Sequence, residues 1–202
     1  MSCELLSSAA PSDLSSSWSA LLCPTGERCL LSAFRGTTVV RSARGAVLAR
    51  FPSRLPGGSP STSHAQHITL LDVIMAPRRT DEPIVLYVLD VMCWRGHPLY
   101  DCDITFRQFW VHSRLAEVGA LTRDEALNPA QLVPLQWLPA TADAMKNALG
   151  QSLQFACCGI ALYHNDAPYI GGPTPLALWV PPEGAQALIE TASQQENGDI
   201  AM

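Results

Sequence analysis

One stretch, residues 84–94, constrains the fold of this chain more than any other. It reads IVLYVLDVMCW, and Asp90 is its only charged residue. A half-exposed strand would alternate polar and apolar side chains, so the length and β-branched content predict a strand buried on both faces. A buried carboxylate without a partner is costly. We therefore expect Asp90 to pair with an arginine or to accept backbone N–H bonds, in a structural role.

A turn and a helix are expected directly after this strand. Arg95-Gly96 interrupts the apolar run, and Pro98 cannot donate a ladder hydrogen bond just beyond it. Asp103 can cap a helix near residues 106–118, in which the residues at helical spacing are Phe106, Phe109, Trp110 and Arg114. From the residues alone, this is a strand–turn–helix unit of a hydrophobic core.

The rest of the chain predicts more strands than helices. Strands are expected at residues 18–22, 29–34, 37–40, 46–51, 67–75, 132–138, 155–163 and 176–180. Pro24-Thr25-Gly26 is the expected turn between the first two, and Ala43-Arg44-Gly45 is the turn of a second hairpin. Thr141 can cap one helix, and Pro181-Pro182 can begin a last one that ends near residue 195. The fold class is therefore α+β, with mostly antiparallel sheets and flanking helices.

Composition limits the number of domains and indicates the cellular compartment. The 202 residues are 48% hydrophobic and 15% charged, which is enough for one sizeable core. We expect a partly disordered segment at residues 1–17, one domain at 18–195, and a polar tail at 196–202. Seven cysteines, an odd number without repeating spacing, favour reduced thiols inside the cell. No apolar run approaches the roughly 20 residues of a membrane span.

Charge limits what the chain can bind. Its formal net charge is -5, which argues against a protein that coats a nucleic-acid backbone, because such binding depends on many Lys and Arg contacts to phosphate. A small nucleotide held by stacking remains compatible. The basic residues are unevenly placed, because residues 28–71 contain no acid and six arginines: Arg28, Arg35, Arg41, Arg44, Arg50 and Arg54. These are either solvated strand ends or a phosphate-facing patch.

The string VLDVMCWRGHPLYDC, at residues 88–102, resembles the signature of the snurportin family. Shorter matches follow the family's order and include Pro11-Ser12-Asp13-Leu14, Leu55-Pro56-Gly57-Gly58 and Thr174-Pro175-Leu176. The resemblance implies an adaptor that recognises the trimethylguanosine cap of small nuclear RNAs for nuclear import of snRNPs. It also implies a fold like that of mRNA guanylyltransferases and DNA ligases.

The resemblance implies particular cap-binding residues. Trp179, after Thr174-Pro175-Leu176, matches the family's cap-stacking tryptophan. A guanine methylated at N7 carries positive charge, which makes it a good partner for an indole face. Arg28 and Arg44 are expected on the cap phosphates, with Arg44 replacing a family lysine one position away. Leu6 stands where the family has a tryptophan beside the methyl groups. The complete expected set is Trp179, Arg28, Glu27, Cys29, Cys23 and Arg44.

The related enzymes form a lysyl-nucleotide adduct, which needs an amine nucleophile and carboxylates for a metal. Here Cys23 stands at the lysine position of their motif and Thr25 at the aspartate, while Lys146 is the only lysine. We therefore expect no enzyme activity and no cofactor. Cys23 with His97 or His112 as its base is a weak alternative. A metal set of Cys93, His97, Cys102 and His112 has none of the common zinc spacings, so no metal is expected.

The expected partners are the trimethylguanosine-capped small nuclear RNA and its snRNP, in the cytoplasm and the nucleus. Importin-β is a further partner that the resemblance implies, although its Arg- and Lys-rich binding segment has no match in this chain. No membrane partner is expected. The alternative function is a degenerate nucleotidyltransferase-fold module that binds proteins and no RNA.

Overall fold

The computed structural model describes residues 1–7, 10–60, 67–79, 81–120, 123–124, 126 and 128–200, with side chains up to residue 197. The chain divides into two compact units. Unit 1 comprises Met1–Thr25, Asp103–Thr105 and Gln136–Met202, and unit 2 comprises Gly26–Cys102 and Phe106–Leu135. The chain first passes from unit 1 to unit 2 between Thr25 and Gly26, and the domain expected over residues 18–195 includes parts of both units.

Unit 1 contains a five-stranded sheet in the order β1-β12-β11-β2-β10. Its strands are β1 (Ser2–Leu5), β2 (Trp18–Pro24), β10 (Trp137–Pro139), β11 (Cys157–His164) and β12 (Pro173–Val180). β1 runs parallel to β12, and the other neighbours are antiparallel. Its helices are α1 (Leu14–Ser17), α3 (Ala142–Gly150), the 3-10 turn η1 (Pro182–Gly184) and α4 (Ala185–Ile200). As expected, the Thr141 side chain accepts a bond from the Ala144 N–H and caps α3.

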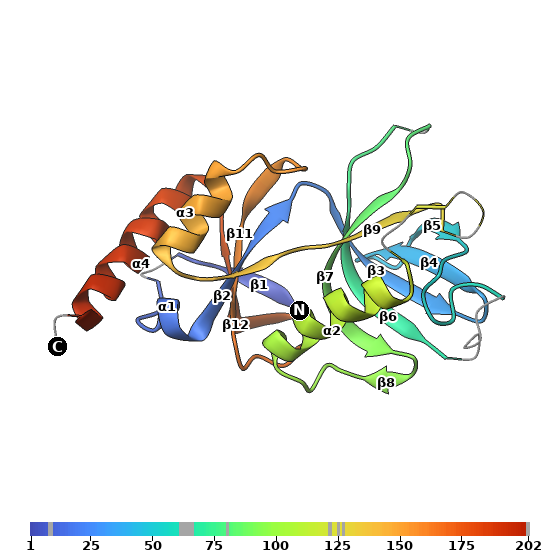
Figure 1. Cartoon of the computed structure of the whole chain (residues 1–202), viewed down its shortest axis with the longest axis horizontal. Coiled ribbons are helices and arrows are strands. Elements are labelled where there is room, and N and C mark those ends of the chain that lie inside the picture. Colours follow the sequence, from blue (N-terminus) through green and yellow to red (C-terminus); the bar gives the residue numbers. More distant parts are fainter. Residues whose placement is uncertain are drawn as a thin grey trace. The chain divides into compact units, whose positions relative to one another are not determined.

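One face of this sheet packs against α3 and α4, which lie side by side (Figure 1). The core between them includes Trp18, Leu22, Leu162 and Val180 from the strands, with Met145 and Leu188 from the helices. Side chains alternate along a strand. Leu178 and Val180 of β12 belong to this core, so Ala177 and Trp179 lie on the opposite face of the sheet. On that face Ala161, Ala177 and Leu21 are buried, whereas Trp179 is only partly buried.

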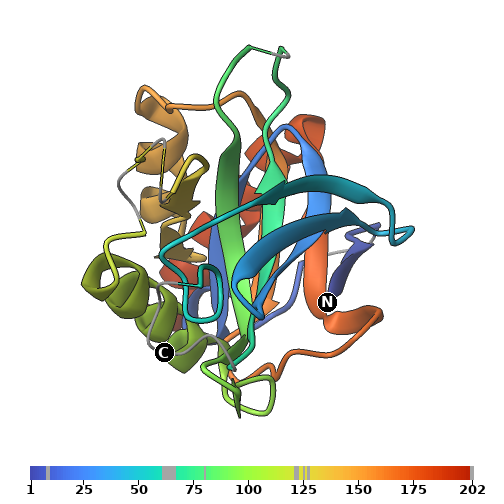
Figure 2. The same ribbon diagram turned by 90° about the vertical axis from the view of Figure 1, so that its right-hand side faces the viewer.

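Unit 2 is built on a second sheet, in the order β5-β4-β3-β6-β7-β8, with β9 parallel to β7 (Figure 2). Its strands are β3 (Glu27–Phe34), β4 (Thr37–Ser42), β5 (Val47–Phe51), β6 (Thr69–Met75), β7 (Val85–Trp94), β8 (His97–Pro98) and β9 (Gln131–Pro134). The core-facing residues of β3 are Cys29, Leu31 and Ala33. Arg28, Leu30 and Ser32 therefore lie on the outer face.

β7 is the buried central strand that the sequence predicts. Nearly all of its residues are buried, and at its end Arg95 and Gly96 both have positive φ in the tight turn to β8. Asp90 has the arginine partner that was expected. Arg107 donates from Nε to Oδ1 at 2.9 Å and from Nη2 to Oδ2 at 3.0 Å. The Val91 N–H adds a bond of 2.7 Å to the same carboxylate.

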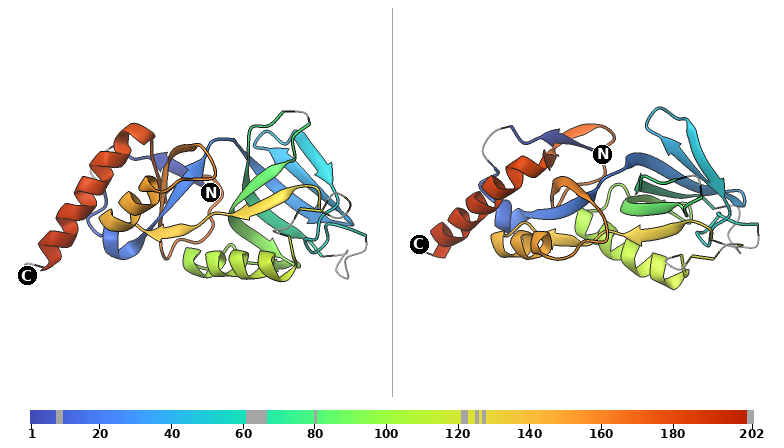
Figure 3. Two further views of the ribbon diagram at one scale, coloured as in Figure 1. Left: turned by 45° about the horizontal axis from the view of Figure 1, so that its top comes forward. Right: turned by 90° about the horizontal axis from the view of Figure 1, so that it is seen from above.

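The helix α2 (Ile104–Glu117) is confirmed and is the green helix of Figure 3. Its inner face differs from the aromatic stripe at helical spacing. Within unit 2 the buried residues of this helix are Arg107, Val111 and Leu115. Phe109 is 70% exposed, and Phe106 is 40% exposed. Arg107 on this inward face reaches Asp90, Phe106 and Phe109 point outward, and Trp110 packs partly against the core.

Three other expectations are wrong in detail. β2 and β3 are not paired with each other, because β2 pairs with β10 and β11 while β3 pairs with β4 and β6. Residues 1–17 contain β1 and α1, and Ser8 and Ala9 lie outside the described residues. α4 continues through residue 200, into the expected polar tail. In the part of the chain that the structure describes, no helix is long and apolar enough to cross a membrane.

Candidate cap-binding residues

Trp179 lies on the face of the unit 1 sheet that α3 and α4 leave uncovered. It is paired with Ala161 on β11 and with Leu5 on β1. Its side chain is partly buried. The Trp179 carbonyl accepts a bond of 2.9 Å from the Leu6 N–H, so the strand on the edge side of β12 fixes the backbone beneath the ring. This arrangement holds an indole in place while leaving part of it accessible.

Gly159 provides the space that the indole occupies. A Cβ built on Gly159 would lie 2.5 Å from Cζ2 and 2.8 Å from Cη2 of Trp179, far inside van der Waals contact. The φ of Gly159 is +150°, a conformation that other residues rarely adopt. A glycine within an apolar strand is the sequence signal for such a close approach, and it could have identified this position.

The apolar residue beside Trp179 is Leu5, not Leu6. Leu5 is directly paired with Trp179 and is 61% exposed, so both side chains lie on the same face. Leu6 points to the other face and packs with Val180 and Leu188. Leu6, the residue that matches the family's tryptophan, therefore lies on the face that packs with α4, because successive residues of a strand face opposite sides of the sheet.

Cys23 is also part of the unit 1 sheet, paired with Gly159. Its side chain is 5% exposed, and burial raises the pKa of the thiol far above its usual range, with smaller contributions from Cys3 and Cys158. A thiol with such a pKa stays neutral near pH 7 and is a poor nucleophile. The geometry supports a packing role for Cys23 beside the Gly159–Trp179 contact.

Three of the expected residues lie together at the start of β3, in unit 2. Glu27 is exposed, Arg28 is partly buried on the outer face, and Cys29 is 4% exposed within the core cluster. Burial, followed by the nearby Glu27, raises the pKa of the Cys29 thiol to about 11. Of these three, Arg28 has the charge and position to meet a phosphate.

Arg28 makes a bidentate ion pair with Asp72. Its Nε donates to Oδ1 at 3.0 Å and its Nη2 to Oδ2 at 2.6 Å. The side chain of Asp72 is 6% exposed and that of Arg28 is 36% exposed. Such a pair orients the guanidinium and keeps it partly open to solvent. The sequence carries no signal for this contact, because the two residues are 44 positions apart.

Arg44 is exposed in the β4–β5 turn, next to Gly45 with a φ of +84°. This confirms the predicted hairpin turn. The structure thus places Trp179 and Cys23 in unit 1 and Arg28, Glu27, Cys29 and Arg44 in unit 2. Within each unit it brings together Cys23 with the Gly159–Trp179 contact, and Glu27 with Arg28 and Cys29.

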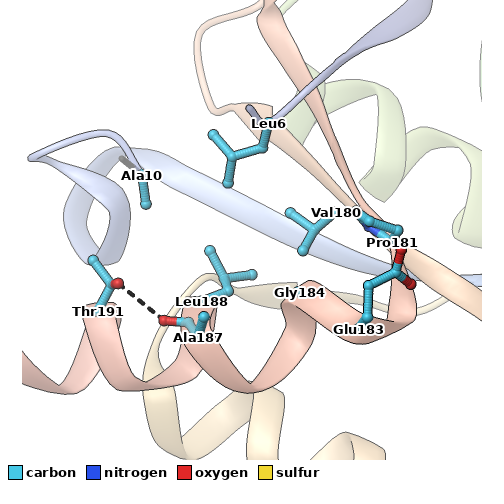
Figure 4. A pocket seen from close by; sticks show the side chains of 9 residues that line it. All are labelled: Leu6, Ala10, Val180, Pro181, Glu183, Gly184, Ala187, Leu188 and Thr191. Atoms are coloured by element: carbon cyan, nitrogen blue, oxygen red, sulfur yellow. Dashed lines mark hydrogen bonds between the residues drawn. The ribbon is translucent and has the colours of Figure 1, made fainter. Parts of the chain in front are cut away.

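The described residues include a pocket on the helix-covered face of unit 1 (Figure 4). Its volume is about 260 Å³, and its walls include Leu6, Ala10, Val180 and Leu188. Thr191 donates its hydroxyl to the Ala187 carbonyl at 2.9 Å within the α4 wall. This pocket faces away from Trp179 and is not part of the same surface.

The alternative sites have little structural support. Among the residues that the structure describes, no group of histidine, cysteine and acidic side chains could hold a metal ion. His112 is bonded through Nε2 to the Leu135 carbonyl at 3.1 Å, and Lys146 is exposed on α3, which covers the face opposite to Trp179.

Solved structures of DNA ligases resemble this fold. The ligase domain of M. tuberculosis LigD aligns with a TM-score of 0.55 and 15% identity, covering 88% of this chain and 58% of that chain. A mycobacterial DNA ligase D complexed with ATP and MES aligns with a TM-score of 0.57 and 16% identity, covering 89% and 60%. This chain therefore spans less than two thirds of those proteins. At these identities the likeness confirms the α+β ligase-like fold and nothing further.

The family match is more specific. A family model described as Snurportin1, m3G cap-binding domain, matches residues 1–182. The match begins with β1 and extends past β12, so it includes Trp179, Gly159 and Arg28. Because it covers nearly the whole chain, this protein belongs to the Snurportin1 m3G cap-binding domain family.

Proposed function

We propose that Trp179 is the residue on which the methylated guanine of the cap stacks. The observation that supports this assignment is the position of Trp179: partly buried, seated on Gly159, and on the sheet face opposite to the helices. An N7-methylated guanine is cationic and is attracted to the face of an indole. A base–aromatic stack is worth roughly 1–3 kcal/mol, which an acidic protein can use without many phosphate contacts.

The neighbours of Trp179 suit the remaining methyl groups of the cap. Leu5 exposes an apolar side chain beside the indole, while the small residues Ala161 and Ala177 on the same face are buried. Methyl groups on the base edge gain from apolar contact and lose nothing by lacking hydrogen bonds. Leu5 therefore favours a base that carries methyl groups over an unmodified guanine.

In unit 2, Arg28 is the proposed contact for the cap phosphates, with Arg44 as a second positive charge. The bidentate bond to Asp72 preorients the Arg28 guanidinium, and phosphate oxygens suit such a group well. Glu27, Cys29 and Cys23 remain sequence predictions. Cys29 and Cys23 are buried, so a contact from either would be through its backbone or through packing.

Intrinsic tryptophan fluorescence tests this proposal. Titration with a trimethylguanosine cap dinucleotide should quench the emission in a saturable manner, because a stacked base reduces indole fluorescence. An unmethylated GpppG dinucleotide is the matched control and should quench only at higher concentration. Saturable binding without any fluorescence change would remove Trp179 from the site. No binding at all would favour the alternative, a protein-interaction module that binds no RNA.

We also propose that the protein is not a nucleotidyltransferase. Lysyl-nucleotide formation needs an amine near the nucleotide, and Lys146, the only lysine, is exposed on a helix that covers the face opposite to Trp179. Incubation with radiolabelled GTP or ATP and magnesium or manganese, followed by denaturation, should leave the protein unlabelled. A DNA ligase treated in parallel provides the positive control. A labelled band that disappears in Lys146→Ala or Cys23→Ala would contradict this proposal.

Import activity implies two compartments and a transport receptor. We propose the cytoplasm and the nucleus as the location of the protein, and importin-β as the receptor through which a capped snRNP would be imported. Family membership supports both.

A further inference from the structure

Arg41 occupies the centre of the outer face of the β3–β4–β5 part of the unit 2 sheet. It is paired with Leu30 on β3 and with Val47 on β5. Its neighbour Val40 belongs to the core, so the Arg41 side chain points to the opposite, outer face. Arg50, which is paired with Val39, lies on the same face. We call the side chains of Arg28, Leu30, Arg41, Val47 and Arg50 the Arg41 face.

Arg41 has an unsatisfied guanidinium nitrogen. Its Nη1 is buried and has no hydrogen-bond partner among the described residues. Buried polar groups are almost always paired, and a charged donor left unpaired is costlier than a neutral one. The guanidinium fork fits the oxygen atoms of a phosphate. Arg41 as a whole is only partly buried, so an anion bound at its guanidinium would complete its bonding after a small movement of the side chain.

The two neighbours of Arg41 in its row are apolar and exposed. Leu30 is 39% exposed and Val47 is 52% exposed. On a sheet face that lies away from the core, these positions are more often polar. An arginine between two exposed aliphatic side chains offers one contact for a phosphate and two for the apolar surface of a ribose or base. This combination suits a nucleotide chain better than a free anion.

The charge of the Arg41 face also favours RNA. No acid occurs in residues 28–71, and Asp72, which is paired with Arg28, is directly opposite Leu30 on β6. The three arginines of the face outnumber this one carboxylate, on a chain whose net charge is -5. Arg54 and Arg35 are engaged elsewhere, the first with Asp124 at 3.1 Å and the second over the Phe34 ring.

We propose that the Arg41 face binds the RNA chain that follows the cap, with Arg41 on a phosphate and with Leu30 and Val47 against the sugar or base. This inference rests on the proposed cap-binding function, because the cap anchors the RNA of which this segment is a part. It adds a second recognition surface that contacts the RNA body. The Arg41 face contacts the sugar–phosphate backbone and the shape of the RNA, so its contribution to affinity does not depend on the RNA sequence.

Calorimetry with two ligands tests the proposal: a trimethylguanosine cap dinucleotide, and the same cap on an RNA of about ten nucleotides, which is within the usual site size for single strands. Arg41→Gln should weaken binding of the capped RNA roughly five- to tenfold, and should make the slope of log affinity against log salt shallower by about 0.7. Affinity for the dinucleotide should not change. Arg54→Gln, which removes the same charge from the same acid-free segment, should behave like the wild type.

A second variant distinguishes a loss of RNA binding from a folding defect. Val47→Asp adds a negative charge at an exposed position and should weaken capped-RNA binding while leaving the dinucleotide unaffected. If Arg41→Gln and Val47→Asp both bind capped RNA like the wild type, the Arg41 face is not an RNA surface. Equal losses for both ligands would place Arg41 in the cap site and would also overturn the proposal. A wild-type protein that binds neither ligand would refute the cap-binding function itself.

Discussion

Replacing Arg107 by methionine is expected to lower the free energy of unfolding by about 3–5 kcal/mol, the largest loss from a single substitution of a charged residue that we expect in unit 2. The side chain of Arg107 is completely buried and makes two bonds to the Asp90 carboxylate. It also donates from Nη1 to the Cys102 carbonyl, at the start of the chain that leads to α2. Without it, a carboxylate that is 5% exposed would remain in the core without its cation.

Urea unfolding measures this loss as a lower midpoint with an unchanged slope. Arg114→Met is the matched control, because Arg114 is on the same helix and forms its ion pair with Glu117 at the surface, where both side chains are more than one third exposed. Exposed pairs contribute about 0–1 kcal/mol. The double variant Asp90→Asn, Arg107→Met should recover part of the stability, because it leaves no buried charge. A loss no larger for Arg107→Met than for Arg114→Met would show that the buried pair is not important for stability.

Features that depend on the polarity of a single segment could be predicted from the sequence. An apolar run of this length identifies β7 as a buried strand, and an acid inside it requires a partner, which the structure provides as Arg107. A hydroxyl residue before an amphipathic stretch identifies the cap of α3 at Thr141. These predictions hold because the physical cause, burial or capping, is local.

What could not be predicted depends on contacts between distant segments. The Pro24-Thr25-Gly26 sequence has the composition of a hairpin turn, but β2 and β3 belong to different sheets. The partners of β2 lie more than a hundred residues away, whereas β3 pairs with the next strand, β4, and with β6 about forty residues away. β1 has too little apolar content to predict a strand, and it forms because β12 offers it an edge. The inward position of Arg107 could not be predicted either, since an arginine on a helix usually faces solvent.

The candidate site likewise has features that could be predicted from the sequence and features that could not. Trp179 can be proposed from its sequence context, whereas its contacts in the sheet cannot. Gly159 is twenty residues away and Leu5 is near the start of the chain, and only the strand pairing brings them to the indole. Arg28 was selected from its place in an acid-free segment, and its partner Asp72 is on β6, where only the register shows the contact.

Replacing Trp179 by alanine should weaken binding of the trimethylguanosine cap dinucleotide by about 1–3 kcal/mol, or roughly 5- to 150-fold. The physical reason is loss of the surface on which the cationic base stacks. Calorimetry gives the affinity directly and does not depend on the five tryptophans that share the fluorescence signal. Trp179→Phe should lose less, because a smaller aromatic face remains. Trp137→Phe is a control from β10, three strands away in the sheet order, and should bind like the wild type.

The variant Gly159→Ala tests whether the position of the Trp179 indole matters for cap binding, because it keeps the indole and displaces it. A methyl group at Gly159 would overlap Cζ2 and Cη2 of Trp179 and approach the Val180 carbonyl at 2.7 Å, so the ring must move away from its seat. We expect this variant to lose cap affinity although every residue with a side-chain role is retained. Thermal unfolding would check that both variants remain folded. If Trp179→Ala and Gly159→Ala were folded and bound the cap with wild-type affinity, the base would have to be recognised elsewhere, and the uncovered face of the unit 1 sheet would have no part in it.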